Sequence, residues 1–122
     1  MYHIEFYTKP NGQKPAKEFI HALDEKMKAK VFKSLDLLEA NGPTLRLPYS
    51  EMLEDGILEL RVKEATNISR VFYFFYIGKR IVLTHGLIKK TQKISPRELE
   101  RAKKYRADFL KQEEHRKRSE KR

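Results

Sequence analysis

The chain has 122 residues, enough for one domain with a core of its own. It carries 27 Lys and Arg against 17 Asp and Glu, a formal net charge of +10, and it contains no cysteine. These numbers exclude a disulfide scaffold, a thiolate zinc site and a cysteine nucleophile, and they favour a polyanionic partner. No apolar run approaches the ~18 residues of a membrane span and no secretory signal is recognisable, so we expect a soluble cytoplasmic protein without a membrane partner.

The first part of the chain predicts a strand followed by helices. Residues 2–7 are rich in β-forming types, and apolar side chains then recur every three or four positions over residues 15–40. Asp24 is a candidate N-cap inside that stretch, so the pattern fits one long helix or a helical hairpin equally well. Gly42 is suited to end the helical stretch, and we expect residues 43–56 to form loops and turns.

Three further strands follow. Residues 57–63 alternate apolar and polar types, residues 68–77 are apolar on both faces as in a central strand, and residues 81–88 complete the set. Their short connections favour an antiparallel meander.

The last predicted element is a helix with a clear start. Ser95, Pro96 and Glu98 form a capping box, and the apolar stripe that follows ends at Leu110. Residues 111–122 are charged and are expected to form a frayed tail.

The element order predicts an α+β fold in a single domain over residues 1–110. A small antiparallel sheet, built from the first strand and the meander, would carry the helical hairpin and the C-terminal helix on one face. Its other face would remain free for polar side chains such as Arg61.

The positive charge is concentrated in the middle of the chain. Residues 65–97 contain seven basic and no acidic residues, whereas residues 1–64 have a net charge of −1 and residues 98–122 a net charge of +4. Because the basic block coincides with the aromatic strands, its charges belong to a packed element. A basic sheet surface with interleaved aromatic residues is typical of a phosphate-binding face.

In an antiparallel meander, the ends of the outer strands lie beside the start of the middle strand. We therefore expect Arg61, Arg70, Lys89 and Lys90 to gather at one edge of the sheet as candidate catalytic residues. Such a group suits metal-independent RNA cleavage, in which a ribose 2′-hydroxyl attacks the adjacent phosphate and arginine binds the developing charge. Glu59, the only acid predicted nearby, is expected to pair with a cation rather than act as a base. Further candidates for RNA contact are Lys63, Lys79, Arg80, His85, Lys93 and Arg97.

His85 is a candidate general base by residue type alone. Its position predicts a face shared with Ile81, Leu83 and Leu87, which is more typical of a core histidine that has found a hydrogen bond. No combination of residues with metal-ligand spacing, no P-loop and no dinucleotide loop is present, so we expect neither a metal nor a cofactor.

Four segments in this order resemble a known family: residues 55–61 (DGILELR), 70–75 (RVFYFF), 85–93 (HGLIKKTQK) and 95–102 (SPRELERA). Together they are similar to the RelE/ParE superfamily of type II toxins, and within it to the HigB-type, phage-derived branch. The resemblance covers most of residues 1–110. It implies a RelE-like sheet with helices on one face and the activity of a ribosome-dependent mRNA interferase, an endoribonuclease.

The resemblance also implies partners: the 70S ribosome with its rRNA and mRNA, and a cognate helix-turn-helix antitoxin in a heterotetramer. Arg61, Arg70, Lys89 and Lys90 occupy the positions of the family's basic residues. Related toxins place a histidine or tyrosine near the C-terminus, whereas this chain ends in Lys, Arg and Glu. The general base therefore stays open among Lys89, Lys90 and His85, and the alternative is catalysis mainly by charge stabilisation and positioning on the ribosome. Two alternatives remain: a ParE-like gyrase inhibitor and a non-catalytic basic nucleic-acid-binding domain.

Overall fold

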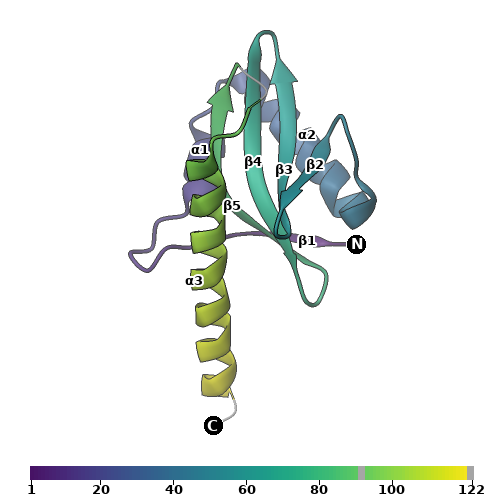
Figure 1. Ribbon diagram of the computed structural model, residues 1–122. Helices are drawn as coiled ribbons and strands as arrows, with labels where there is room; N and C mark the ends of the chain where they lie inside the picture. Colours follow the sequence, from purple (N-terminus) through teal and green to yellow (C-terminus); the bar gives the residue numbers. More distant parts are fainter. Residues whose placement is uncertain (91–92, 121–122) are drawn as a thin grey trace.

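The computed structural model describes residues 1–90 and 93–120, whose strands form a single mixed sheet in the order β1-β5-β4-β3-β2 (Figure 1). β1 pairs in parallel with β5, and the other neighbours are antiparallel. The strands are β1 (His3–Phe6), β2 (Ser50–Glu54), β3 (Ile57–Glu64), β4 (Asn67–Tyr76) and β5 (Arg80–Lys89). The helices are α1 (Pro15–His21), α2 (Glu25–Asn41), a 3₁₀ turn (Gly42–Thr44) and α3 (Pro96–Glu120).

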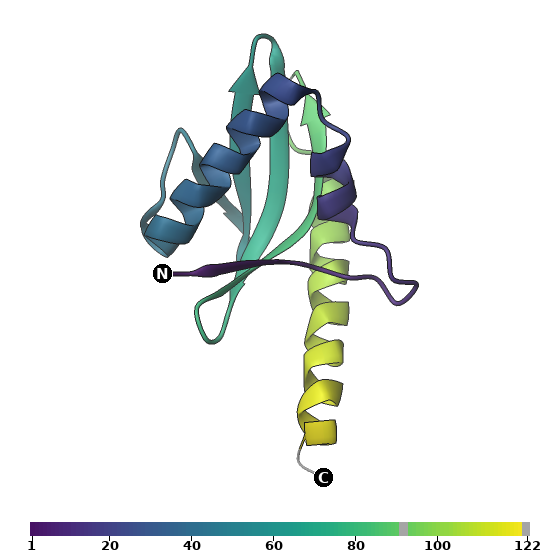
Figure 2. The ribbon, with the colours of Figure 1, turned by 180° about the vertical axis from the view of Figure 1, so that it is seen from behind.

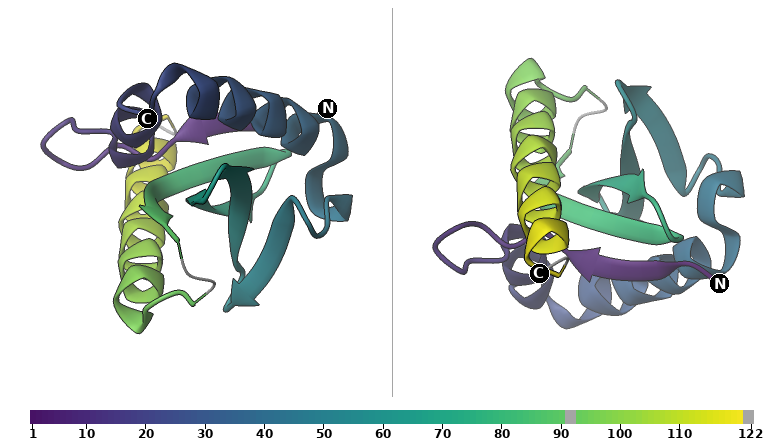
Figure 3. Two further views of the ribbon diagram at one scale, coloured as in Figure 1. Left: turned by 90° about the horizontal axis from the view of Figure 1, so that it is seen from above. Right: turned by 90° about the horizontal axis from the view of Figure 1, so that it is seen from below.

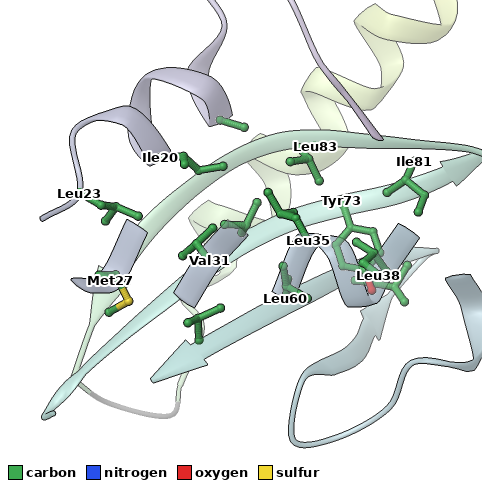
Figure 4. Packing of buried hydrophobic residues seen from close by; sticks show 14 residues of the cluster. Ile20, Leu23, Met27, Val31, Leu35, Leu38, Leu60, Tyr73, Ile81 and Leu83 are labelled. Atoms are coloured by element: carbon green, nitrogen blue, oxygen red, sulfur yellow. The ribbon is translucent and has the colours of Figure 1, made fainter. Parts of the chain in front are cut away.

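The helical stretch in the first half of the chain is a hairpin. Asp24 separates α1 from α2, and its carboxylate accepts a hydrogen bond from the Met27 backbone N–H at 2.9 Å. Both helices cover the same face of the sheet (Figure 2). Their apolar stripes meet alternate residues of the central strands, including Leu60 and Tyr73, in the main core (Figure 4).

The C-terminal helix lies on the other face, so the expectation of helices on one face alone is corrected. α3 packs Ala102 and Phe109 against Phe72 and Phe74 of β4 in a second core. Views along the sheet show α1 and α2 on one side and α3 on the other (Figure 3). The physical reason is that β4 is apolar on both faces, and each face needs a covering layer to exclude water.

Two strands at the sheet edges differ from the sequence prediction. β2 lies within residues 43–56, where only loops and turns were expected, and pairs antiparallel with β3. Ser50 is buried there, and its hydroxyl hydrogen-bonds the Tyr73 hydroxyl. β1 joins β5 in parallel, so the sheet is mixed rather than wholly antiparallel. Hydrogen bonding to β3 stabilises β2, whose own sequence does not indicate a strand. β1 was expected as a strand, and only its parallel pairing differs from the prediction.

The charged segment after Leu110 also differs from the expected frayed tail, because α3 continues as a helix to Glu120. Glu113 is buried and its carboxylate accepts a hydrogen bond from Arg80 at the start of β5. Ion pairs at helical spacing follow, such as Arg116 with Glu120. Charge pairing, not an apolar stripe, supports this part of the helix, and residues 121–122 lie outside the described residues.

Candidate nucleic-acid interface

The strand register brings basic residues together at one end of the α3-facing side of the sheet. Arg61 on β3 is paired with Arg70 on β4. Two residues further along the strands, Lys63 of β3 and Lys89 of β5 flank Ile68 of β4. Lys63 and Lys89 are thus two strand spacings apart, or about 10 Å between backbones. The juxtaposition expected from the meander is present, and Lys90 follows directly at an exposed position.

Glu59 organises the two arginines. Its Oε1 accepts hydrogen bonds from Arg70 Nη1 at 2.6 Å and from Arg61 Nε at 2.9 Å, which confirms that this acid pairs with cations. A second acid, Glu51 of β2, accepts from Arg61 Nη2 at 2.5 Å. Sequence reasoning missed Glu51 because its segment was expected to be a loop, and only strand pairing places it beside Arg61.

Burial divides the roles of the two arginines. The side chains of Arg70 and Glu59 are 0% exposed, whereas 21% of the Arg61 side chain reaches solvent. Burial opposes the charge on Arg61, but Glu59 and Glu51 outweigh it and raise the pKa of the guanidinium. Arg61 is therefore the arginine that can meet a phosphate, and Arg70 fixes Arg61 through the shared carboxylate of Glu59.

A β-bulge places His85 on the α3 side of the sheet. Phe72 is opposite His85, but the next residue, Tyr73, is opposite Leu83, so Thr84 is the extra residue on β5. The side chains of Ile81 and Leu83 stay in the α1–α2 core, while the His85 ring stacks on Phe72 at 4.8 Å between centroids. The predicted shared face of His85 with Ile81 and Leu83 is therefore wrong, because strict alternation does not hold across a bulge.

The environment of His85 favours the neutral imidazole. Burial, followed by the charge of Arg101, lowers its pKa to about 4. Glu98 Oε2 lies 3.7 Å from His85 Nε2, but Arg101 lies 3.4 Å from the other Glu98 oxygen and offsets its charge. Glu98, in the first turn of α3, thus faces His85. His85 is buried and packed within the structure.

Two of the candidate RNA contacts lie at the opposite end of the sheet. Arg80 begins β5, donates hydrogen bonds to Glu5 at 2.7 Å and to Glu113, and lies over the Tyr76 ring at 5.1 Å. These partners raise its pKa, with Glu5 the largest contributor. Lys79 lies over the Tyr2 ring at 5.8 Å in the preceding turn. Both cations are separated by the length of β5 from Lys89, so they do not belong to the cluster around Arg61.

The remaining candidates are accessible. Lys63, Lys93 and Arg97 are exposed, and Lys89 is half-buried. Thr91 and Gln92 of the resembling segment lie outside the described residues. Within residues 1–90 and 93–120, no group of three or more His, Asp or Glu side chains could hold a metal ion. In the same residues, no helix combines the length and apolar character needed to cross a bilayer.

The fold and this basic end of the sheet define a small α+β protein of RelE-like architecture with a cationic face. Comparison with protein families is consistent with that class. The chain belongs to the phage-derived protein Gp49-like family (DUF891), whose model matches residues 18–107. This is a family of toxin-like proteins of toxin–antitoxin systems. No curated protein matches the chain in sequence.

Proposed function

We propose that this protein is a HigB-type toxin that cleaves mRNA on the translating ribosome and is silenced by a cognate antitoxin. The observation that carries the proposal is the row of cations around Arg61 at one end of the sheet. Arg61 is held by Glu59 and Glu51 yet reaches solvent, and Lys63, Lys89 and Lys90 surround that end. Membership of a toxin-like family supports the same activity.

The proposed reaction uses the ribose 2′-hydroxyl of the message as the nucleophile. Its oxygen forms a bond to the neighbouring phosphorus as the bond from phosphorus to the 5′-oxygen breaks, giving a 2′,3′-cyclic phosphate and a free 5′-hydroxyl. Negative charge builds on the phosphoryl oxygens, and the Arg61 fork is suited to bind two of them. Losing one such donor typically costs ~2.7–4 kcal/mol of transition-state stabilisation. The need for a 2′-hydroxyl restricts cleavage to RNA.

Burial decides which side chains could take part directly. Arg70 is fully buried and His85 is 4% exposed, so neither meets substrate in this conformation. We assign Arg70 a positioning role through Glu59. Lys89 and Lys90 lie at the accessible end of β5 and are the groups we propose for the two proton transfers. One, as the neutral amine, accepts the 2′-hydroxyl proton, and the other, as the ammonium, donates a proton to the leaving 5′-oxygen.

Primer extension on a defined message after induction tests this proposal. The wild type should produce new ends at codon-phased positions, and Arg61→Ala and Lys90→Ala should lose them. Arg80→Ala is the matched control, because it removes an arginine that lies outside the cluster. Growth arrest with intact message would instead indicate a ParE-like gyrase inhibitor, and RNA binding with neither arrest nor cuts would indicate a non-catalytic basic domain.

The same proposal includes partners. The exposed cations Lys63, Lys93 and Arg97 would contact rRNA phosphates, and a helix-turn-helix antitoxin would form a two-plus-two assembly with the toxin. Co-expression with the neighbouring open reading frame, followed by mass measurement of the purified complex, tests the stoichiometry.

A further inference from the structure

A groove of about 630 Å³ adjoins the cationic row, between α2, the segment before β2, and the end of β3. Its volume is within the range of pockets that bind ligands or side chains from a partner. One wall is α2, the other is the segment 47–49, and β3 lies between them. The residues that line it are Lys30, Lys33, Ser34, Leu37, Leu47, Pro48, Tyr49, Arg61, Val62 and Lys63.

The residues of α2 that line the groove share one face of the helix. Residues 30, 33, 34 and 37 follow the i, i+3, i+4, i+7 spacing, with Leu37 as the apolar member and two lysines beside it. Across the groove, Leu47 is 59% exposed and Tyr49 is 44% exposed. Large apolar side chains are thus available to solvent on one wall, opposite a helix face on which Lys30 and Lys33 are exposed and Leu37 is half-buried.

The charges around the groove have one sign. Its lining includes four cations and, among the described residues, no acid. Lys30 pairs with Glu64 and Arg61 with Glu51, both from just outside the lining. Lys33 and Lys63 have no carboxylate within ion-pair distance in the described part of the chain. The groove therefore combines an aliphatic floor with a basic rim.

We infer that this groove binds an amphipathic helix of a partner protein, with aliphatic side chains on one face and acidic residues beside them. Leu37, Leu47 and Tyr49 would receive the aliphatic face, and Lys33 and Lys63 would pair with the acids. A nucleic-acid strand fits less well, because base stacking needs aromatic platforms and Tyr49 is the only aromatic lining residue described. A second copy of this chain, with a charge of +10, would be repelled.

Arg61 links this groove to the cationic row. It lines the groove and is also the solvent-reaching arginine of the Glu59 cluster. An acidic side chain of the docked helix at this position would compete with phosphate for the same guanidinium. This consequence, unlike the docking itself, rests on the proposed function.

Isotope-edited NMR on the full chain tests the docking. The probe is a designed peptide of about 18 residues with leucines on one helical face and glutamates elsewhere. A scrambled peptide of the same composition and a single-stranded oligouridine are the comparison ligands. We expect the helical peptide alone to shift the backbone amide signals of Leu37 and Val62. Equal shifts from the scrambled peptide, shifts of these signals by the oligouridine, or no shifts with the helical peptide would overturn the inference.

Charge reversal on α2 provides matched variants. Lys33→Glu should weaken peptide binding by about tenfold or more. Lys26→Glu makes the same charge change at an exposed α2 position outside the groove and should alter the affinity by less than about twofold. Equal weakening by both variants would show attraction to net charge rather than docking. Peptide binding without any message cleavage by the protein would leave the docking intact and contradict only the proposed function.

Discussion

Glu59 Oε1 lies 2.6 Å from Arg70 Nη1, and both side chains are completely buried. The same oxygen accepts a hydrogen bond from Arg61, which reaches solvent. One carboxylate therefore connects a buried arginine with an accessible one. This hydrogen bond fixes the direction of the Arg61 guanidinium. A long side chain without such a partner would have no fixed direction.

This connection predicts different stability effects for the two acids that contact Arg61. Glu59→Gln keeps the volume but removes the buried negative charge that Arg61 and Arg70 share, so it should lower the free energy of unfolding by about 3–5 kcal/mol. Glu51→Gln removes a carboxylate whose side chain is 41% exposed and should cost no more than about 1 kcal/mol. Urea unfolding at neutral pH compares the two. Equal losses of unfolding free energy in the two variants would contradict the larger stabilising role that we assign to the buried Glu59.

Arg61 is expected to act on rate rather than on stability. Arg61→Ala should reduce message cleavage by about 10²–10³-fold, because the forked donor to the phosphoryl oxygens is lost. Arg61→Lys keeps the charge without the fork and should recover only part of that loss. Single-turnover cleavage on programmed ribosomes measures both. Full activity in Arg61→Ala would remove this residue from the site.

Arg80 is expected to act on stability rather than on the cleavage rate. Its bonds to Glu5 and Glu113 attach the end of α3 to the sheet, and the low pKa of Glu113, about 2, reflects pairing with Arg116 and Arg80. Arg80→Ala should lower the free energy of unfolding by about 1–3 kcal/mol while the folded protein keeps its cleavage rate. Lys79→Ala is the control for loss of a neighbouring positive charge. Loss of cleavage in folded Arg80→Ala would return Arg80 to the RNA-binding surface.

His85 predicts a pH dependence of stability. Its folded pKa of about 4 lies below the ordinary value of 6.5, so the unfolded chain binds more protons between these values. Stability contributed by the neutral ring should be complete above pH 6.5 and fall by up to about 3 kcal/mol as the pH drops to 4. His85→Phe keeps an aromatic ring against Phe72 and should lack this pH-dependent contribution to stability. Unfolding curves of both proteins at pH 7 and 4.5 test it, since titrations that they share cancel in the comparison.

Local patterns in the sequence were sufficient for most of the elements. The cap at Asp24, the alternation along β3 and the apolar run of β4 each depend on neighbours close in the chain, and the structure confirms them. Antiparallel pairing of the meander followed from its short turns, and it correctly placed Arg61, Arg70 and Lys89 at one end of the sheet.

The rest depended on contacts between distant segments. β2 forms because β3 offers it hydrogen bonds, and that pairing brings Glu51 to Arg61. The bulge at Thr84 turns His85 to the α3 face, which alternation within β5 does not indicate.

The sequence by itself determined the class of fold, the concentration of positive charge and the basic residues at the end of the meander, because each follows from composition or from neighbours along the chain. Only the tertiary structure decided which arginine meets solvent and which is enclosed. That outcome depends on how tightly the layers pack around each side chain and on Glu59 lying between Arg61 and Arg70. Burial and ion pairing are properties of packed surfaces, and those surfaces exist only after the layers have assembled.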